Sequence, residues 1–285
     1  MSSATCPICN EIPDAATRNC VSCGHDLGCP NVRAACSPQE VKALRERHER
    51  ASSLAAERGL GSEFALLRDH IKTDSRVVVA IRPLQARHLL GDPKHLYTNY
   101  EQLVGAGARV AAPFDQDTER RAVGGKLFGS YADEIRYGVL SLDGKGIANY
   151  GGVFMRLREV SVRTRVSFLE ENSFVFCKGF AVDATSQLPR GSRCDWDSRC
   201  DLASAKLWPD LKPGSKPAEW ARQLVFNGQT REDDRFIEAH IYGPFNASAI
   251  EDIEFAGPGK SREERNDIGC VRELWKKRAS GVCMR

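Results

Sequence analysis

The chain has 285 residues, with 41 Lys and Arg against 38 Asp and Glu, so its formal net charge is +3. Hydrophobic residues make up 41% of it, enough for a packed core, which excludes wholesale disorder. The nearly balanced charge gives no broad field for polyanions, so nucleic acid is an unexpected partner. The sequence has no apolar run long enough for a membrane span and no apolar signal stretch. We therefore expect a soluble protein made in the cytosol without a Sec signal, and export by another route stays open.

The cysteines are unevenly distributed. Of 11 Cys, six lie in the first 36 residues, at positions 6, 9, 20, 23, 29 and 36. Cys6 with Cys9 and Cys20 with Cys23 form two CxxC pairs, and two such turns complete a tetrahedral Zn²⁺ shell. A segment this short cannot bury enough apolar surface to fold alone, so the metal would supply its folding free energy. We predict a zinc-ribbon module over residues 1–36 with these four ligands.

Three further residues leave the ligand list open. His25, Cys29 or Cys36 could replace one of the four cysteines or help to form a second site, and redox-active or unligated thiols are the alternatives to zinc. The module carries only Arg18 and Arg33 as basic residues and no aromatic side chain. Phosphate binding and base stacking would require more of both. A structural or protein-docking role is the better interpretation.

Helices are predicted directly after the module. Ser37-Pro38-Gln39-Glu40 has the pattern of an N-cap, a proline at the first helical position and a capping-box glutamate. Gly59 and Gly61 interrupt the helix, and a second helical stretch follows up to residue 72. We interpret 37–72 as a helical connector and 73–285 as the large domain.

Short strands dominate the large domain. They are predicted at 76–82, 137–142, 152–160, 160–168, 174–180, 235–242 and 249–255. Helical patterns occur near 198–208, 217–226 and 261–279. We therefore expect an α+β fold with a mainly antiparallel β core and peripheral helices. Neither a Rossmann nor a P-loop fingerprint is present.

Two of these strands have a polar face. Side chains alternate along a strand, so Phe236, Glu238, His240 and Tyr242 share one side of strand 235–242, opposite an apolar side. We interpret the polar side as facing a cleft, although an exposed sheet face would look the same. In strand 160–168, Ser167 lies with serine and arginine residues on one face.

These features resemble the mono-ADP-ribosyltransferase toxins. A first strand that ends in Arg82 is followed by a middle strand with a Ser/Thr motif and a late strand with Glu238. The segments RYGVLSL, YGGVFMRL, VRTRVSFLEENS and FIEAHIYGP are similar to a bacterial family with YGALNL-, RTTF-GDS- and EAQ-HGP-like motifs. The chain is also similar in general character to type III effectors that ADP-ribosylate threonine in ubiquitin. The resemblance spans residues 76–255, and each motif is short.

The resemblance implies NAD as substrate and an ADP-ribosyltransferase-like catalytic domain over 73–285. Arg82 would hold the NAD phosphates, since a guanidinium can grip a pyrophosphate with two hydrogen bonds. Ser167, with Thr164, would orient the nicotinamide ribose. Glu238 would bind the 2′-hydroxyl of that ribose and stabilise an oxocarbenium-like transition state.

The other implied roles are less specific. His240 would deprotonate the acceptor or bind ribose. Tyr97 would stack on a base, unless it simply packs in the core. The implied acceptor is a protein, with a hydroxyl side chain of host ubiquitin as one candidate.

The sequence departs from the family at Phe236, where the family often has Glu or Gln. This argues against arginine as the acceptor. If His240 occupied the catalytic position, Glu238 would become the preceding acid, so two registers stay open. Two smaller hypotheses concern a metal site at His88 and His95 and a Cys177–His240 nucleophile pair. A different class of function is a zinc-ribbon adaptor that binds protein or nucleic acid without catalysis.

Overall fold

The computed structural model describes residues 5–98, 114–180 and 188–280. Within these ranges the chain forms a seven-stranded sheet of order β5-β4-β8-β2-β1-β3-β9, in which every neighbouring pair is antiparallel. The α+β class with an antiparallel core is therefore confirmed. The strands of the sheet are β1 (Arg76–Ile81), β2 (Ile135–Ser141), β3 (Val153–Leu157), β4 (Val166–Leu169), β5 (Arg193–Asp195), β8 (Glu238–Tyr242) and β9 (Ile250–Phe255). A separate ribbon pairs β6 (Val225–Phe226) with β7 (Arg235–Phe236).

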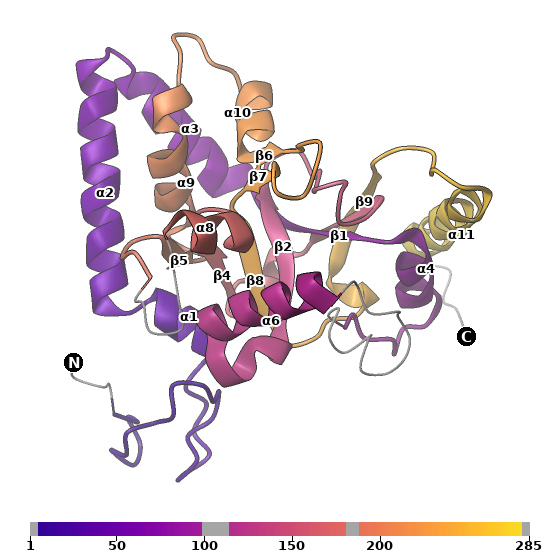
Figure 1. Ribbon diagram of the computed structural model, residues 1–285, viewed down its shortest axis with the longest axis horizontal. Coiled ribbons are helices and arrows are strands. Elements are labelled where there is room, and N and C mark those ends of the chain that lie inside the picture. Colours follow the sequence, from indigo (N-terminus) through magenta and orange to yellow (C-terminus); the bar gives the residue numbers. More distant parts are fainter. Residues whose placement is uncertain (1–4, 99–113, 181–187, 281–285) are drawn as a thin grey trace.

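Helices surround this sheet (Figure 1). The described α-helices are α1 (Pro30–Ala35), α2 (Pro38–Glu57), α3 (Gly61–Asp74), α4 (Pro83–Gly91), α6 (Phe114–Phe128), α7 (Glu159–Val162), α8 (Ser173–Gly179), α9 (Arg199–Leu207), α10 (Pro217–Leu224) and α11 (Arg262–Ala279). The 3₁₀ turns are η1 (Gly129–Glu134), η2 (Trp208–Asp210) and η3 (Ala247–Ala249). Along the described ranges, no helix combines the length and the hydropathy needed to cross a lipid bilayer.

Each face of the sheet is buried under its own helices. One face packs on α2, α3, α4, α9, α10 and α11 in a single large core, to which strand residues such as Val77 and Phe168 contribute. On the other face, α6 and α8 cover β2 and β4 through a smaller cluster that includes Phe128 and Phe176. Because α2 and α3 supply buried leucines to the large core, the segment expected to be a connector is packed into the main body.

The sheet forks between β1 and β2. These strands are paired only at Arg76–Ser141, Val77–Leu140 and Val78–Val139. Beyond that point β1 follows β3, and β2 follows β8. Figure 1 shows β1 leading toward α4 while β2 runs toward α6.

Gly138 lies at the point where the strands separate. A Cβ atom there would be 2.8 Å from the carbonyl oxygen of Val78 and 3.2 Å from a Val79 methyl group. Real Cβ atoms essentially never come this close to backbone, so glycine permits the close approach of the two strands.

One predicted strand is wrong in part, and another is a helix. In the segment 160–168, residues Glu159–Val162 form helix α7, and only Val166–Leu169 is a strand. An i,i+4 ion pair between Glu159 and Arg163, with 3.3 Å between N and O, favours the helical turn. The segment 174–180 lies in helix α8, because the Asn172 side chain caps it by accepting the Phe174 N–H at 3.1 Å. Aromatic and β-branched composition had suggested a strand in each case.

Candidate functional site

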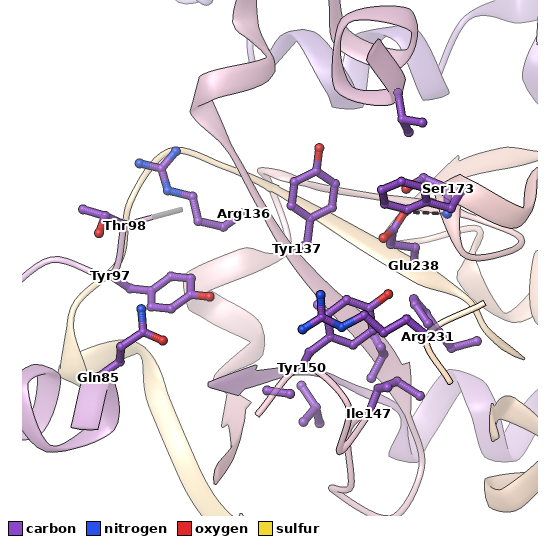
Figure 2. A pocket seen from close by; sticks show the side chains of 17 residues that line it. Gln85, Tyr97, Thr98, Arg136, Tyr137, Ile147, Tyr150, Ser173, Arg231 and Glu238 are labelled. Carbon is purple, nitrogen blue, oxygen red and sulfur yellow. Dashed lines mark hydrogen bonds between the residues drawn. The ribbon is translucent and has the colours of Figure 1, made fainter. Parts of the chain in front are cut away.

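A pocket opens in the fork of the sheet (Figure 2). It holds about 1090 Å³ of empty space, including the part open to solvent. Its lining residues are Val78, Ala80, Gln85, Tyr97, Thr98, Val123, Arg136, Tyr137, Gly138, Val139, Ile147, Tyr150, Ser173, Phe174, Arg231, Phe236 and Glu238. Consecutive residues of β2, Arg136 to Val139, line the pocket, because β1 separates from β2 there and leaves both sides of β2 accessible.

Glu238 is the carboxylate in the wall of this pocket. It begins β8 and is 7% exposed. Its Oε2 accepts a hydrogen bond from the Ser173 backbone N–H at 3.1 Å and lies 3.0 Å from Nε2 of His240. Two contacts to one oxygen fix the orientation of the carboxyl group. Figure 2 shows Ser173 and Glu238 side by side, joined by the hydrogen bond to the Ser173 backbone.

His240 lies behind Glu238, away from the pocket lining. The ring centroid of Phe128 is 4.8 Å from that of the imidazole, and the centroid of Tyr137 is 5.6 Å away, both nearly edge-on. Across the sheet, His240 pairs with Ser167 on β4 and with Tyr137 on β2. The imidazole therefore contacts the carboxylate rather than the space where a ligand would lie.

A half-buried ion pair supports the loop that supplies the Ser173 N–H. Lys206 Nζ donates to the Glu170 carbonyl at 2.6 Å and lies 3.2 Å from Glu171 Oε2. Burial lowers the pKa of Lys206. The other oxygen of Glu171 accepts the backbone N–H of Phe236 at 3.2 Å. The loop before α8 and the start of the Glu238 strand are thus joined through one carboxylate.

Aromatic and cationic side chains line other parts of the pocket. The Arg231 guanidinium lies 5.2 Å from the centre of the Tyr150 ring and donates to the Asn149 carbonyl. Tyr97 stacks on Phe245, with 4.7 Å between ring centroids. Burial lowers the pKa of Arg136, which lies near Tyr97 (Figure 2). The pocket can therefore offer a carboxylate, guanidinium groups and rings to one ligand.

The residues implied by the resemblance lie in different places. Glu238 and Tyr97 line the pocket. Ser167 is buried beside His240, and its hydroxyl accepts a hydrogen bond from Asn31 Nδ2 at 3.1 Å, so it lies outside the lining. Thr164 is exposed in the turn before β4.

Arg82 and Cys177 are also outside this lining. Arg82 is exposed and precedes α4 as its N-cap residue, so Arg82, Ser167 and Glu238 do not converge on one cleft in this structure. Cys177 is buried in the cluster under α8, and burial raises the pKa of its thiol. A buried thiol with a raised pKa is a poor nucleophile.

The four cysteines predicted as zinc ligands lie together. The Sγ atoms of Cys6, Cys9, Cys20 and Cys23 are all within 4.8 Å of one another. Among the described residues, they form the only group of three or more Cys, His, Asp or Glu side chains with this spacing. His25, Cys29 and Cys36 are not part of it, and the rings of His88 and His95, although 6.3 Å apart, have no third ligand in such a group.

The backbone of both turns suits thiolate ligands. The Asn10 N–H donates to the Cys6 carbonyl at 2.9 Å, and the Gly24 N–H donates to the Cys20 carbonyl at 2.8 Å. Both donors have a positive φ, 60° and 74°. Backbone N–H groups of Cys23 and Ser22 lower the pKa of the Cys20 thiol to about 6, and the equivalent groups lower that of Cys6, whereas burial and the neighbouring thiols raise the pKa of Cys9 to about 12 and also raise that of Cys23. Four close sulfurs with this backbone fit a tetrahedral zinc site.

Arg136, Tyr150 and Arg231 were missed at the sequence level. Arg136 lies directly before the YGVLSL motif, but β2 was interpreted without a fork, which is what brings its side chain into the pocket wall. Tyr150 and Arg231 come from loops 81 positions apart in the chain. No local pattern marks such a pair.

No protein-family model matches this chain, and a search of curated proteins finds no match either.

Proposed function

We propose that the chain is a mono-ADP-ribosyltransferase that cleaves NAD and transfers ADP-ribose to a protein acceptor. The observation that supports it best is Glu238 in the wall of the forked-sheet pocket, oriented by His240 and by the Ser173 N–H. The second register considered above, with His240 in the catalytic position, is disfavoured because His240 lies behind the carboxylate. In this proposal the protein acts as a bacterial effector on a host protein.

The reaction needs little beyond a placed carboxylate and a bound dinucleotide. The bond between C1′ of the ribose and the nicotinamide nitrogen breaks, and nicotinamide leaves with the bonding electron pair. Positive charge develops on the ribose, where the Glu238 carboxylate stabilises it and binds the 2′-hydroxyl. The acceptor hydroxyl then forms the new C1′–O bond and loses its proton to a base or to water.

The other lining residues suit the remaining parts of NAD. The guanidinium of Arg231 would pair with a phosphate, and Tyr150 or Tyr97 would stack on a flat ring. Arg82, which the resemblance assigns to the phosphates, is exposed beside the lining, so Arg231 is the better candidate for that role.

The acceptor would be a protein, with ubiquitin as one candidate on resemblance alone. A hydroxyl acceptor remains the better proposal, because Phe236 replaces the acid that would assist attack by arginine. Phe236 is buried and lines the pocket.

A zinc-ribbon adaptor is the second candidate function. The observation that favours it is the exposure of branched side chains on the cysteine module: Ile8 is 66%, Ile12 66% and Val21 75% exposed. Figure 1 shows that this module protrudes from the main body. Apolar side chains in such a position are suited to contact with another protein.

The deciding experiment measures nicotinamide release from NAD by the purified chain, with Glu238→Gln as the test variant. We expect turnover to fall by roughly 10²–10³-fold with NAD affinity nearly unchanged, because the carboxylate acts mainly on the transition state. Glu254→Gln is the matched control, since Glu254 is an exposed glutamate on β9 outside the pocket lining.

Equal turnover by the wild type and Glu238→Gln would reject Glu238 as the catalytic carboxylate. Absence of both NAD cleavage and NAD binding would favour the adaptor. Label transferred from NAD to one protein of a lysate would support transfer rather than simple hydrolysis.

A further inference from the structure

Helix α1 follows the two CxxC turns of the cysteine module and packs on β4 and on β8, the strand that carries both Glu238 and His240. Its residue Asn31 is 3% exposed. The Nδ2 group of Asn31 lies 2.8 Å from the His240 carbonyl oxygen, 3.1 Å from Ser167 Oγ and 3.2 Å from the Arg165 carbonyl oxygen. One amide group therefore joins β4 and β8 at the level of His240.

The same helix also holds the module. Arg33 donates through Nη2 to the backbone carbonyls of Thr17 at 2.8 Å, Ala15 at 2.9 Å and Asp14 at 3.3 Å. These carbonyls belong to the segment between the two CxxC turns. Asn31 and Arg33 are two residues apart on one short helix. Asn31 contacts the sheet, and Arg33 contacts the segment between the two CxxC turns.

The contact with His240 bears on the pocket. The backbone of His240 is paired with Ser167 on one side and with Tyr137 on the other. Its imidazole orients Glu238, so a displacement of β8 would change where the carboxylate points. Small displacements of this kind reduce turnover strongly even when the altered residue does not touch the substrate.

We propose that Asn31 is a positioning residue for Glu238 and that α1 makes this position depend on the folded cysteine module. The inference rests on the proposed function for its effect on turnover. Its effect on His240 is independent of that function.

The first test uses Asn31→Asp, which keeps the shape but removes the donor, and Asn31→Ala as a second variant. We expect the kcat for NAD cleavage to fall about 10- to 100-fold while KM changes less than about threefold, as for other residues that orient a site. The ring-nitrogen NMR signals of His240 should shift in both variants.

Ser204→Ala is the matched control. Ser204, in α9, is fully buried, and its hydroxyl is 3.1 Å from Nδ1 of His48. It is not a lining residue of the pocket, so its variant shows the effect of losing a buried polar group elsewhere. Asn31 variants with kcat and His240 signals no more altered than in Ser204→Ala would overturn the positioning role. If the wild-type protein failed to cleave NAD, the proposed function would be rejected. The NMR signals of His240 would then be the only test of whether Asn31 positions that residue.

The second test is Arg33→Ala, which releases the module and leaves Asn31 in place. The His240 signals should move in the same direction as in Asn31→Ala, by a smaller amount. Unchanged signals would overturn the dependence on the module while keeping Asn31 as a local contact.

Discussion

Arg231 and Arg82 are the two candidate residues for binding the pyrophosphate of NAD. Arg231 lines the pocket over Tyr150, whereas Arg82 is exposed at the start of α4. We expect Arg231→Ala to weaken NAD binding by roughly tenfold or more, the size of a charge-assisted hydrogen bond, and Arg82→Ala to leave it nearly unchanged. Calorimetric titration with NAD measures both, and the reverse result would return the phosphate contact to Arg82.

At this scale, the sequence predicted which residues of one strand lie together. Alternation along the late strand correctly placed Glu238 and His240 on one face, as their 3.0 Å contact confirms. The sequence did not show that His240 contacts the carboxylate and lies outside the pocket lining. The Phe128 ring packs against the imidazole, and Phe128 belongs to an element more than 100 residues earlier in the chain.

Among the elements, the fork depends on Gly138. A methyl group at this position would lie 2.8 Å from the Val78 carbonyl oxygen, which is backbone and cannot move alone. We expect Gly138→Ala to reduce the free energy of unfolding by about 1–3 kcal/mol, the usual cost of overpacking. Urea denaturation provides the measurement.

Gly125→Ala is the control for that experiment. Gly125 is exposed in α6, and a methyl group added there would meet no neighbouring atom within 4 Å, so alanine should be neutral or stabilise the helix by up to about 1 kcal/mol. If both variants were equally stable, the fork would not require glycine.

Local signals decided which elements were predictable. Ser37 and Pro38 mark the start of α2 directly in the sequence, and the structure has Ser37 at the N-cap position. The predicted capping box is not formed: the Ser37 side chain makes no capping hydrogen bond, and Glu40 accepts from the Gly191 N–H and Arg193 instead. The strand composition of 174–180 gave the wrong result, since the Asn172 side chain accepts the Phe174 N–H and caps a helix there. The fork was not predictable, because it depends on β1 and β2, which lie more than 50 residues apart.

For the whole molecule, the metal site offers the clearest prediction. We expect about one zinc per chain in the wild type and almost none after Cys6→Ser with Cys9→Ser, since two of four ligands are lost. Metal analysis by mass spectrometry measures this, with Cys270→Ser, a half-buried thiol in α11, as the control. Full zinc content in the double variant would rule out this ligand set.

Zinc binding should also weaken as the pH falls, because protons compete for the thiolates. Without metal, the Cys20 thiol, whose pKa is lowered to about 6, is mostly ionised at neutral pH, whereas the Cys9 thiol, whose pKa is raised to about 12, must lose its proton to bind zinc. Zinc release to a chelator, followed from pH 8 to pH 5, should therefore accelerate toward the acid end. A flat profile would contradict thiolate ligation.

The forked sheet also has a consequence for association between molecules. A sheet normally has two open edges, each able to pair with a strand of another chain. Beyond Val78, the part of the chain that the structure describes pairs β1 with β3 only, so a third edge lies inside the molecule. Val78 and Ala80 of that edge line the pocket. Recognition through backbone atoms at this place would persist through many side-chain substitutions, since it depends on the path of the strand alone.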